Sequence, residues 1–109
     1  MQLYIAGFKQ VANKNIYGCD YTLYVDEASN RAKLTCIGRN LSIASGSSNY
    51  EASGWIPSKY KPSESIHSLV QRGNVLIFFL WNSGICGLTN LQSTTLTNTS
   101  WNIQVEYSF

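Results

Sequence analysis

The chain contains a single histidine, His67, and its neighbours decide whether it could take part in catalysis. On an extended strand Ser65 and His67 would share a face, which leaves a Ser–His dyad open, whereas Glu64 would point to the other side and could not complete a triad. Glycoside hydrolysis needs two carboxylates about 5–10 Å apart. None of the six acidic residues stands in a recognisable motif of that kind. The chain is therefore predicted to be non-catalytic.

The three cysteines, Cys19, Cys36 and Cys86, are 17 and 50 residues apart and include no C-x-x-C pair. Only His67 could complete a zinc set, so neither a metal site nor a cofactor is expected. An odd number of cysteines argues against a disulfide framework, although a single bridge stays open. We expect three reduced, mostly buried thiols in a protein assembled in the cytosol.

Groups suited to binding are easier to find than groups suited to catalysis. Saccharide sites lay an aromatic ring against the C–H surface of the sugar and use amide, carboxylate or Arg groups for its hydroxyls. Trp81 ends an apolar run beside Asn82, at the rim of an expected turn, and is the best single candidate. A second cluster is expected at the opposite end of the same hairpin, formed by His67, Arg72 and Asn74. These five residues are the predicted ligand-binding positions.

The elements that must position these groups are strands, because apolar and polar residues alternate along much of the chain. Alternation marks residues 20–26, 33–37 and 101–109, whereas the small, polar residues 44–54 are expected to form an exposed loop. In the last of these strands Trp101 lies on the apolar face, so we expect it in the core. Strand signals about 8–12 residues apart predict an antiparallel β-sandwich or jelly-roll-like barrel with little helix.

One segment, residues 75–81, is apolar on both faces of the strand that it predicts. A sandwich strand needs only one buried face, so the second must be covered by a loop of the same chain or by another subunit. The odd-numbered face consists of Val75, Ile77, Phe79 and Trp81. We favour a subunit interface and assign it to the even-numbered face, which consists of Leu76, Phe78 and Leu80.

Length and composition limit the classes of function. With 109 residues the chain is expected to form one domain, in which residues 1–18 are either an N-terminal strand or a tether. A hydrophobic content of 44% excludes a disordered chain, and a net charge of only +2 argues against a dedicated nucleic-acid binder. The longest apolar run is far shorter than the ~20 residues of a membrane helix, so no membrane insertion is expected.

The most distinctive stretch of the sequence is segment 54–63, which reads Gly-Trp-Ile-Pro-Ser-Lys-Tyr-Lys-Pro-Ser. Its two prolines fix an extended crossing, and Pro62 keeps Lys61 out of the helical region. The segment resembles the (small)-x-(I/L)-P-x-x-Y-(R/K)-P-S crossing of C-terminal head domains in receptor-binding, baseplate and tail-fibre proteins of tailed bacteriophages. In that family a terminal W-x-I-x-(V/I)-x-Y strand follows, as in residues 101–107, and the order of elements is similar from about Tyr21 to Phe109.

This resemblance implies a β-sandwich or jelly-roll head that forms a homotrimer, binds a bacterial cell-wall or surface polysaccharide and joins other phage tail proteins. It also implies a location at the tail tip of the virion, after assembly in the cytoplasm of the bacterial host. Two alternatives stay open: a structural trimeric tip or baseplate domain without a specific ligand, and a lectin-like carbohydrate-binding module outside phages. Glycan binding by the isolated domain would separate the first alternative from receptor recognition.

Overall fold

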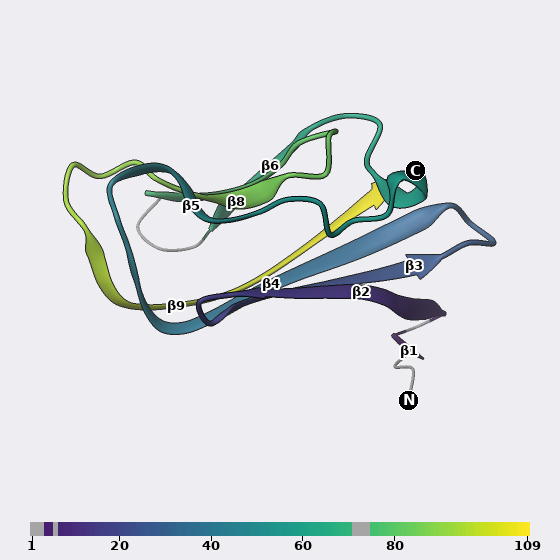
Figure 1. Cartoon of the computed structure of the whole chain (residues 1–109), viewed down its shortest axis with the longest axis horizontal. Helices are drawn as coiled ribbons and strands as arrows, with labels where there is room; N and C mark the ends of the chain where they lie inside the picture. Colours follow the sequence, from purple (N-terminus) through teal and green to yellow (C-terminus); the bar gives the residue numbers. More distant parts are fainter. Residues whose placement is uncertain (1–3, 6, 71–74) are drawn as a thin grey trace.

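The chain folds into two antiparallel β-sheets that face each other (Figure 1). The structure, a computed structural model, describes residues 4, 5, 7–70 and 75–109. The only helical element in this described part is one 3-10 turn, and it holds no helix that could cross a membrane. The predicted all-β antiparallel sandwich with little helix is thus confirmed. In chain order the elements are β1 (Tyr4–Ile5), β2 (Phe8–Ile16), β3 (Cys19–Asp26), β4 (Arg31–Ile43), β5 (Gly46–Ala52), η1 (Ser58–Tyr60), β6 (Ile66–Val70), β7 (Leu76–Leu80), β8 (Cys86–Asn90) and β9 (Leu96–Ser108).

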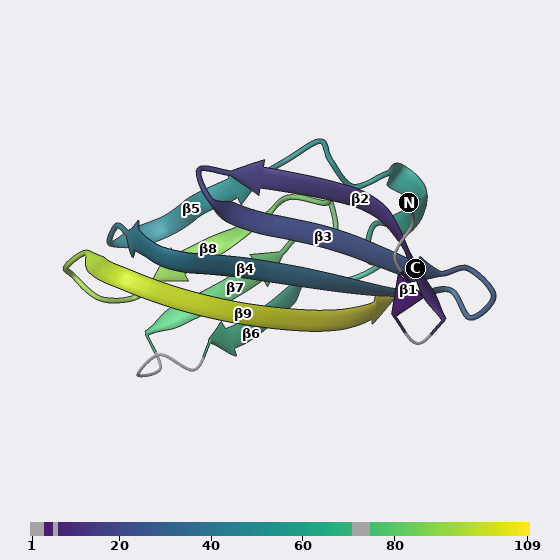
Figure 2. The same cartoon turned by 90° about the horizontal axis from the view of Figure 1, so that it is seen from below.

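The strands are arranged in the order β1-β2-β3-β4-β9 in the larger sheet and β5-β8-β7-β6 in the smaller one. The chain therefore passes between the sheets twice, from β4 to β5 and from β8 to β9 (Figure 2). Of the two alternatives for the N-terminal residues, the strand is correct for residues 8–16, which form β2. The loop expected over residues 44–54 is wrong, since β5 lies within it. That strand pairs irregularly with β8 and has positive φ at Ser48 and Tyr50, so it lacks the alternation by which strands are recognised.

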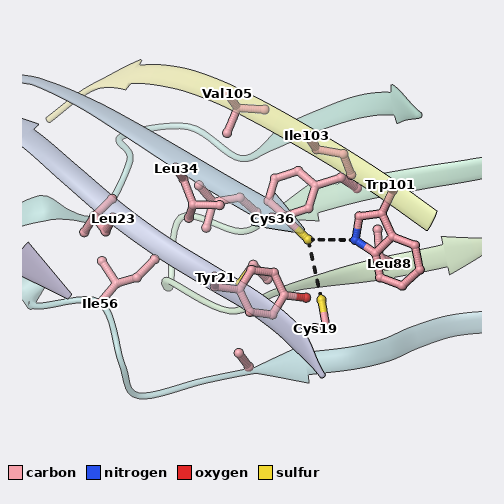
Figure 3. Packing of buried hydrophobic residues seen from close by; sticks show 14 of the residues in the cluster. Cys19, Tyr21, Leu23, Leu34, Cys36, Ile56, Leu88, Trp101, Ile103 and Val105 are labelled. Atoms are coloured by element: carbon pink, nitrogen blue, oxygen red, sulfur yellow. Dashed lines mark hydrogen bonds between the residues drawn. The ribbon is translucent and has the colours of Figure 1, made fainter. Parts of the chain in front are cut away.

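The core lies between the sheets and includes Trp101, which is 5% exposed, as its position on the apolar face of its strand predicts. Its ring lies across Gly38 of the neighbouring strand, where a Cβ would come within 2.3 Å of Trp101 Cζ2. The indole Nε1–H donates a hydrogen bond to Cys36 Sγ at 3.3 Å, and that sulfur lies 3.6 Å from Cys19 Sγ (Figure 3). A glycine on β4 is thus what allows the largest side chain of β9 to close this end of the core.

The three cysteines are buried, as expected. Burial raises the pKa of Cys86 to about 12, and burial likewise raises the pKa of Cys36. The pKa of Cys19 is lowered, chiefly by its hydrogen bond with Cys36. The 3.6 Å between the sulfur atoms of Cys19 and Cys36 is well beyond the ~2.05 Å of a disulfide bond.

Strand β7 corrects one of our predictions. The even-numbered residues Leu76, Phe78 and Leu80 are fully buried in the core, so their assignment to a subunit interface is wrong. Their side chains face the larger sheet of the same chain, and a side chain with no exposed surface has none left to bury against a second copy. The odd-numbered residues form the outer face of the sheet, and that face holds the candidate site described below.

The segment that carries the family resemblance connects β5 to β6 and includes η1. The Tyr60 N–H donates to the carbonyl of Pro57 at 2.9 Å, and the Tyr60 carbonyl accepts a 2.5 Å hydrogen bond from the Tyr107 hydroxyl. The Tyr60 hydroxyl donates to the Glu27 carboxylate, which also pairs with Lys59 at 2.9 Å. The crossing is therefore fastened to the β3–β4 turn through Glu27 and to the end of β9 through Tyr107, which is a structural role.

Candidate functional site

The outer face of the smaller sheet carries the odd-numbered side chains of three of its strands, β6, β7 and β8. In the register of β6, β7 and β8, His67 lies opposite Phe79 and Phe79 lies opposite Gly87, while Leu69 lies opposite Ile77 in the adjacent row. Since directly opposed residues of antiparallel strands share a face, these residues form one continuous surface.

Three aromatic side chains meet on this surface, and we call His67, Phe79 and Trp81 the aromatic platform. The His67 and Trp81 rings meet edge to face with their centroids 4.9 Å apart, and the Phe79 and Trp81 rings are 5.1 Å apart and tilted by 34°. Phe79 is only 3% exposed, whereas Trp81 is 38% exposed. The platform therefore consists of one exposed indole supported by two neighbouring rings.

A glycine explains why the Phe79 ring can lie close against β8. A Cβ at Gly87 would be 2.7 Å from Phe79 Cζ and 3.1 Å from the carbonyl oxygen of Asn49. Any side chain at this position would push the Phe79 ring away from the sheet. The absence of a side chain at Gly87 thus determines how closely the Phe79 ring packs on β8.

The turn after β7 holds the Trp81 backbone from both sides. Its N–H donates to the carbonyl of Ile85 at 2.8 Å, and its carbonyl accepts the N–H of Gly84 at 2.9 Å. The next residue, Asn82, donates its backbone N–H to Ser65 Oγ at 3.1 Å and is exposed. An exposed amide thus follows the exposed aromatic residue directly in the chain, and saccharide sites use both kinds of group.

The structure brings together three of the five predicted ligand-binding residues, Trp81, Asn82 and His67. His67 was expected at the far end of the hairpin, and that placement is wrong, because its partner on β7 is Phe79, two residues from Trp81. Arg72 and Asn74 lie outside the described residues. Sequence reasoning also missed Phe79 and Gly87 as supports of the indole. Counting residue pairs of the β7–β8 hairpin outward from the turn at residues 82–84 would have placed these two opposite each other.

Charge is absent from the strands that carry the platform, since β6, β7 and β8 contain no Asp, Glu, Lys or Arg. The surface also includes two leucines that are more than half exposed, Leu69 at 55% and Leu91 at 58%. The side-chain stem of Lys61, a basic residue, packs over Gly84 of the adjoining turn. A surface of this kind favours an uncharged ligand bound by ring contact and neutral hydrogen bonds.

Two concave regions of the described surface lie elsewhere. A shallow pocket of about 310 Å³ is formed by residues 37–39 and 100–102 on the larger sheet. A groove of about 220 Å³ separates residues 62–66 from residues 106–108, so Glu64 and Glu106 both line it. Both oxygens of Glu106 are already engaged, one with Arg31 at 3.2 Å and one with Lys33 at 3.3 Å. Of these two glutamates, therefore, only Glu64 has a carboxylate that forms no ion pair among the described residues.

Comparison of the chain with protein-family models, with curated proteins and with solved structures finds no match. The arguments for function therefore come from the geometry of the chain and from its sequence.

Proposed function

We propose that this domain binds an uncharged saccharide on a bacterial surface through the aromatic platform, without catalysis. The observation that carries the proposal is the exposed Trp81 indole, which packs against the rings of Phe79 and His67. The flat face of a pyranose ring packs its C–H groups against such an indole. The exposed Asn82 amide and the exposed His67 ring are the groups that would hydrogen-bond its hydroxyls.

The biological setting in the proposal rests on the resemblance of segment 54–63 to the crossing of bacteriophage head domains. On that basis the domain is a receptor-binding head at the tail tip of a virion, in contact with other tail proteins. We do not carry over the homotrimer that the resemblance implies, because the residues first assigned to its interface are core residues.

The experiment is glycan-array and calorimetric binding with the 109-residue domain. We expect binding to bacterial cell-wall or surface polysaccharide by the wild type and a loss of at least about tenfold for Trp81→Ala, a typical effect of removing an aromatic anchor. The matched control is Tyr17→Ala, which removes another exposed aromatic ring, 91% exposed, from the β2–β3 turn. Circular dichroism confirms that both variants are folded.

Three outcomes would contradict the proposal. Absence of binding by the wild type would favour the structural tip domain, and equal losses for Trp81→Ala and Tyr17→Ala would show that the platform is not the site. Release of reducing ends from the polysaccharide, abolished by Glu64→Gln, would show that the domain is an enzyme that uses the groove between residues 62–66 and 106–108.

A further inference from the structure

The two sheets have four lateral edges, and three of them carry features that natural proteins use to prevent edge-to-edge association. At one edge the two-residue strand β1 covers β2, which has a register shift at Gln10/Ala12 and carries Lys9 and Lys14. Strand β5 has two register shifts within its seven residues. Strand β6 has only five residues.

The fourth edge, β9, has none of these protective features along most of its length. Among the described residues it pairs with β4 alone, and its register shifts lie before Trp101. From Trp101 to Ser108 the pairing is regular, and the segment contains no Lys, Arg or Pro. Figure 2 shows this strand along the outer side of the larger sheet. An unprotected edge of this length is a template for another strand.

The direction of the backbone groups on β9 follows from one hydrogen bond. The Phe109 N–H donates to the Asn30 carbonyl of the neighbouring chain segment at 3.0 Å, in the same register as the β4–β9 pairs. Because N–H and C=O groups alternate between the two sides of a strand, the odd residues 101–107 also face β4. The even residues of the regular segment direct their backbone groups to the open edge; these are Asn102, Gln104, Glu106 and Ser108.

We propose that two copies of this chain associate through their β9 strands, antiparallel and about a twofold axis at Gln104. Gln104 is the even residue nearest the middle of the regular segment 101–108, so this register pairs most of it. Each even residue from Asn102 to Glu106 then faces an even residue of the other copy, and three opposed pairs with two hydrogen bonds each satisfy the backbone groups of these residues on the open edge. The larger sheets of the two copies become one continuous sheet.

Side chains on the outer face are compatible with this register. Gln104 faces its own copy across the axis, and Asn102 faces Glu106 of the second copy, so no charged side chain opposes a like charge. A register centred on Glu106 would instead oppose two carboxylates at the axis. Glu106 is also held by Arg31 and Lys33 of its own sheet, which keeps its charge compensated at the junction.

The inner face supports the same association. The apolar side chains of β9 retain small exposed fractions, whereas many core residues on β3 and β4 have none, among them Tyr21, Leu23, Leu34 and Cys36. A strand added alongside β9 would place its own apolar residues next to this incompletely covered row and bury it further. The residues that gain cover are Trp101 (5%), Ile103 (8%), Val105 (8%) and Tyr107 (7%).

The test is the molar mass of the full chain by light scattering coupled to gel filtration and by analytical ultracentrifugation. We expect a concentration-dependent dimer of about 24 kDa, twice the 12.2 kDa of the chain. Gln104→Pro removes a backbone N–H that makes no bond to β4, so the variant should stay folded and become monomeric. Gln104→Ala keeps the N–H and should remain dimeric, and thermal unfolding verifies that both variants are folded.

A charge pair at one position tests the register itself. Asn102→Glu places two like-charged pairs against Glu106 across the twofold axis, and Asn102→Lys places two opposite-charged pairs there. With about 0.5 kcal/mol for each cross-strand pair, the dissociation constant should rise roughly fivefold for the first variant and fall roughly fivefold for the second. The proposal is overturned by a monomer or a trimer at all concentrations, by a dimer that survives Gln104→Pro, or by equal responses to the two Asn102 variants.

Discussion

Replacing Gly38 with alanine adds one methyl group at a position where the structure has no room for it. A Cβ there would lie 2.3, 2.5 and 2.6 Å from the Trp101 ring carbons Cζ2, Cε2 and Cη2. Gly38 has no positive φ, so the backbone itself would accept alanine and the steric contact is isolated from conformational strain. The indole must therefore move, and its hydrogen bond to Cys36 Sγ must lengthen or break.

The expected loss of stability follows from these contacts. Overpacking of a close-packed core costs about 1–3 kcal/mol, and the lost hydrogen bond adds about 0.5–1.5 kcal/mol. Alanine also restricts the unfolded chain, which returns about 0.4–1 kcal/mol to the folded state. We therefore expect the free energy of unfolding to fall by roughly 2–3 kcal/mol, which lowers Tm by about 10–20 °C for a domain of this size.

Thermal and urea denaturation followed by circular dichroism measure this effect, and a double-mutant cycle assigns it to the indole. In a Trp101→Leu background the ring is gone, so Gly38→Ala should cost little there and the two substitutions should be coupled by about 2 kcal/mol. A Tm within about 2 °C of wild type for Gly38→Ala, or an equal loss of stability in both backgrounds, would contradict this. Either result would show that the contact between Gly38 and the Trp101 ring does not determine the packing of β9.

Two further predictions concern the face assignment of β7 and the anchoring of the crossing. Phe78→Ala should lower the free energy of unfolding by about 3–5 kcal/mol without changing the oligomeric state, whereas Leu69→Ala, at a position 55% exposed, should change it by less than about 0.5 kcal/mol. A folded Phe78→Ala variant with altered molar mass would restore the interface assignment. The hydrogen bond from Tyr60 and the ion pair with Lys59 hold the pKa of Glu27 below its ordinary value, so its contribution to stability is present above that ordinary value and is lost as the pH falls through the lowered one. The Tm difference between wild type and Glu27→Gln should accordingly shrink on acidification from pH 6 to pH 3, and a constant difference would contradict this.

Strand β9 shows how far alternation alone can determine structure. Its period of two separates apolar Trp101, Ile103, Val105 and Tyr107 from polar neighbours, and all four are buried as that pattern predicts. The pattern cannot distinguish an edge strand from a central one, because pairing on the far side of a strand depends on segments distant in the sequence. The open edge of β9 was therefore visible only in the folded chain.

Strand β7 shows where the same pattern fails. Both faces of residues 75–81 are apolar, so alternation divides the residues into two sets but contains nothing that selects the inward one. The selection depends on the larger sheet, because Leu76, Phe78 and Leu80 pack in one core with residues of β3, β4 and β9 that are distant in the sequence. The outward set then combines with His67 of the adjacent strand, and the candidate site arises from the register of a hairpin rather than from any motif.

The proposed binding surface and the proposed dimer junction use different parts of the molecule, and this has a consequence for affinity. The aromatic platform lies on the outer face of the smaller sheet, whereas the junction extends the larger sheet in its own plane. Association through β9 therefore leaves both platforms exposed. A polysaccharide presents the same sugar many times, so binding at one platform raises the effective concentration of the ligand at the second. A shallow surface with a single exposed indole binds one sugar weakly, and pairing two such surfaces strengthens binding to a polymer without any new contact to the sugar.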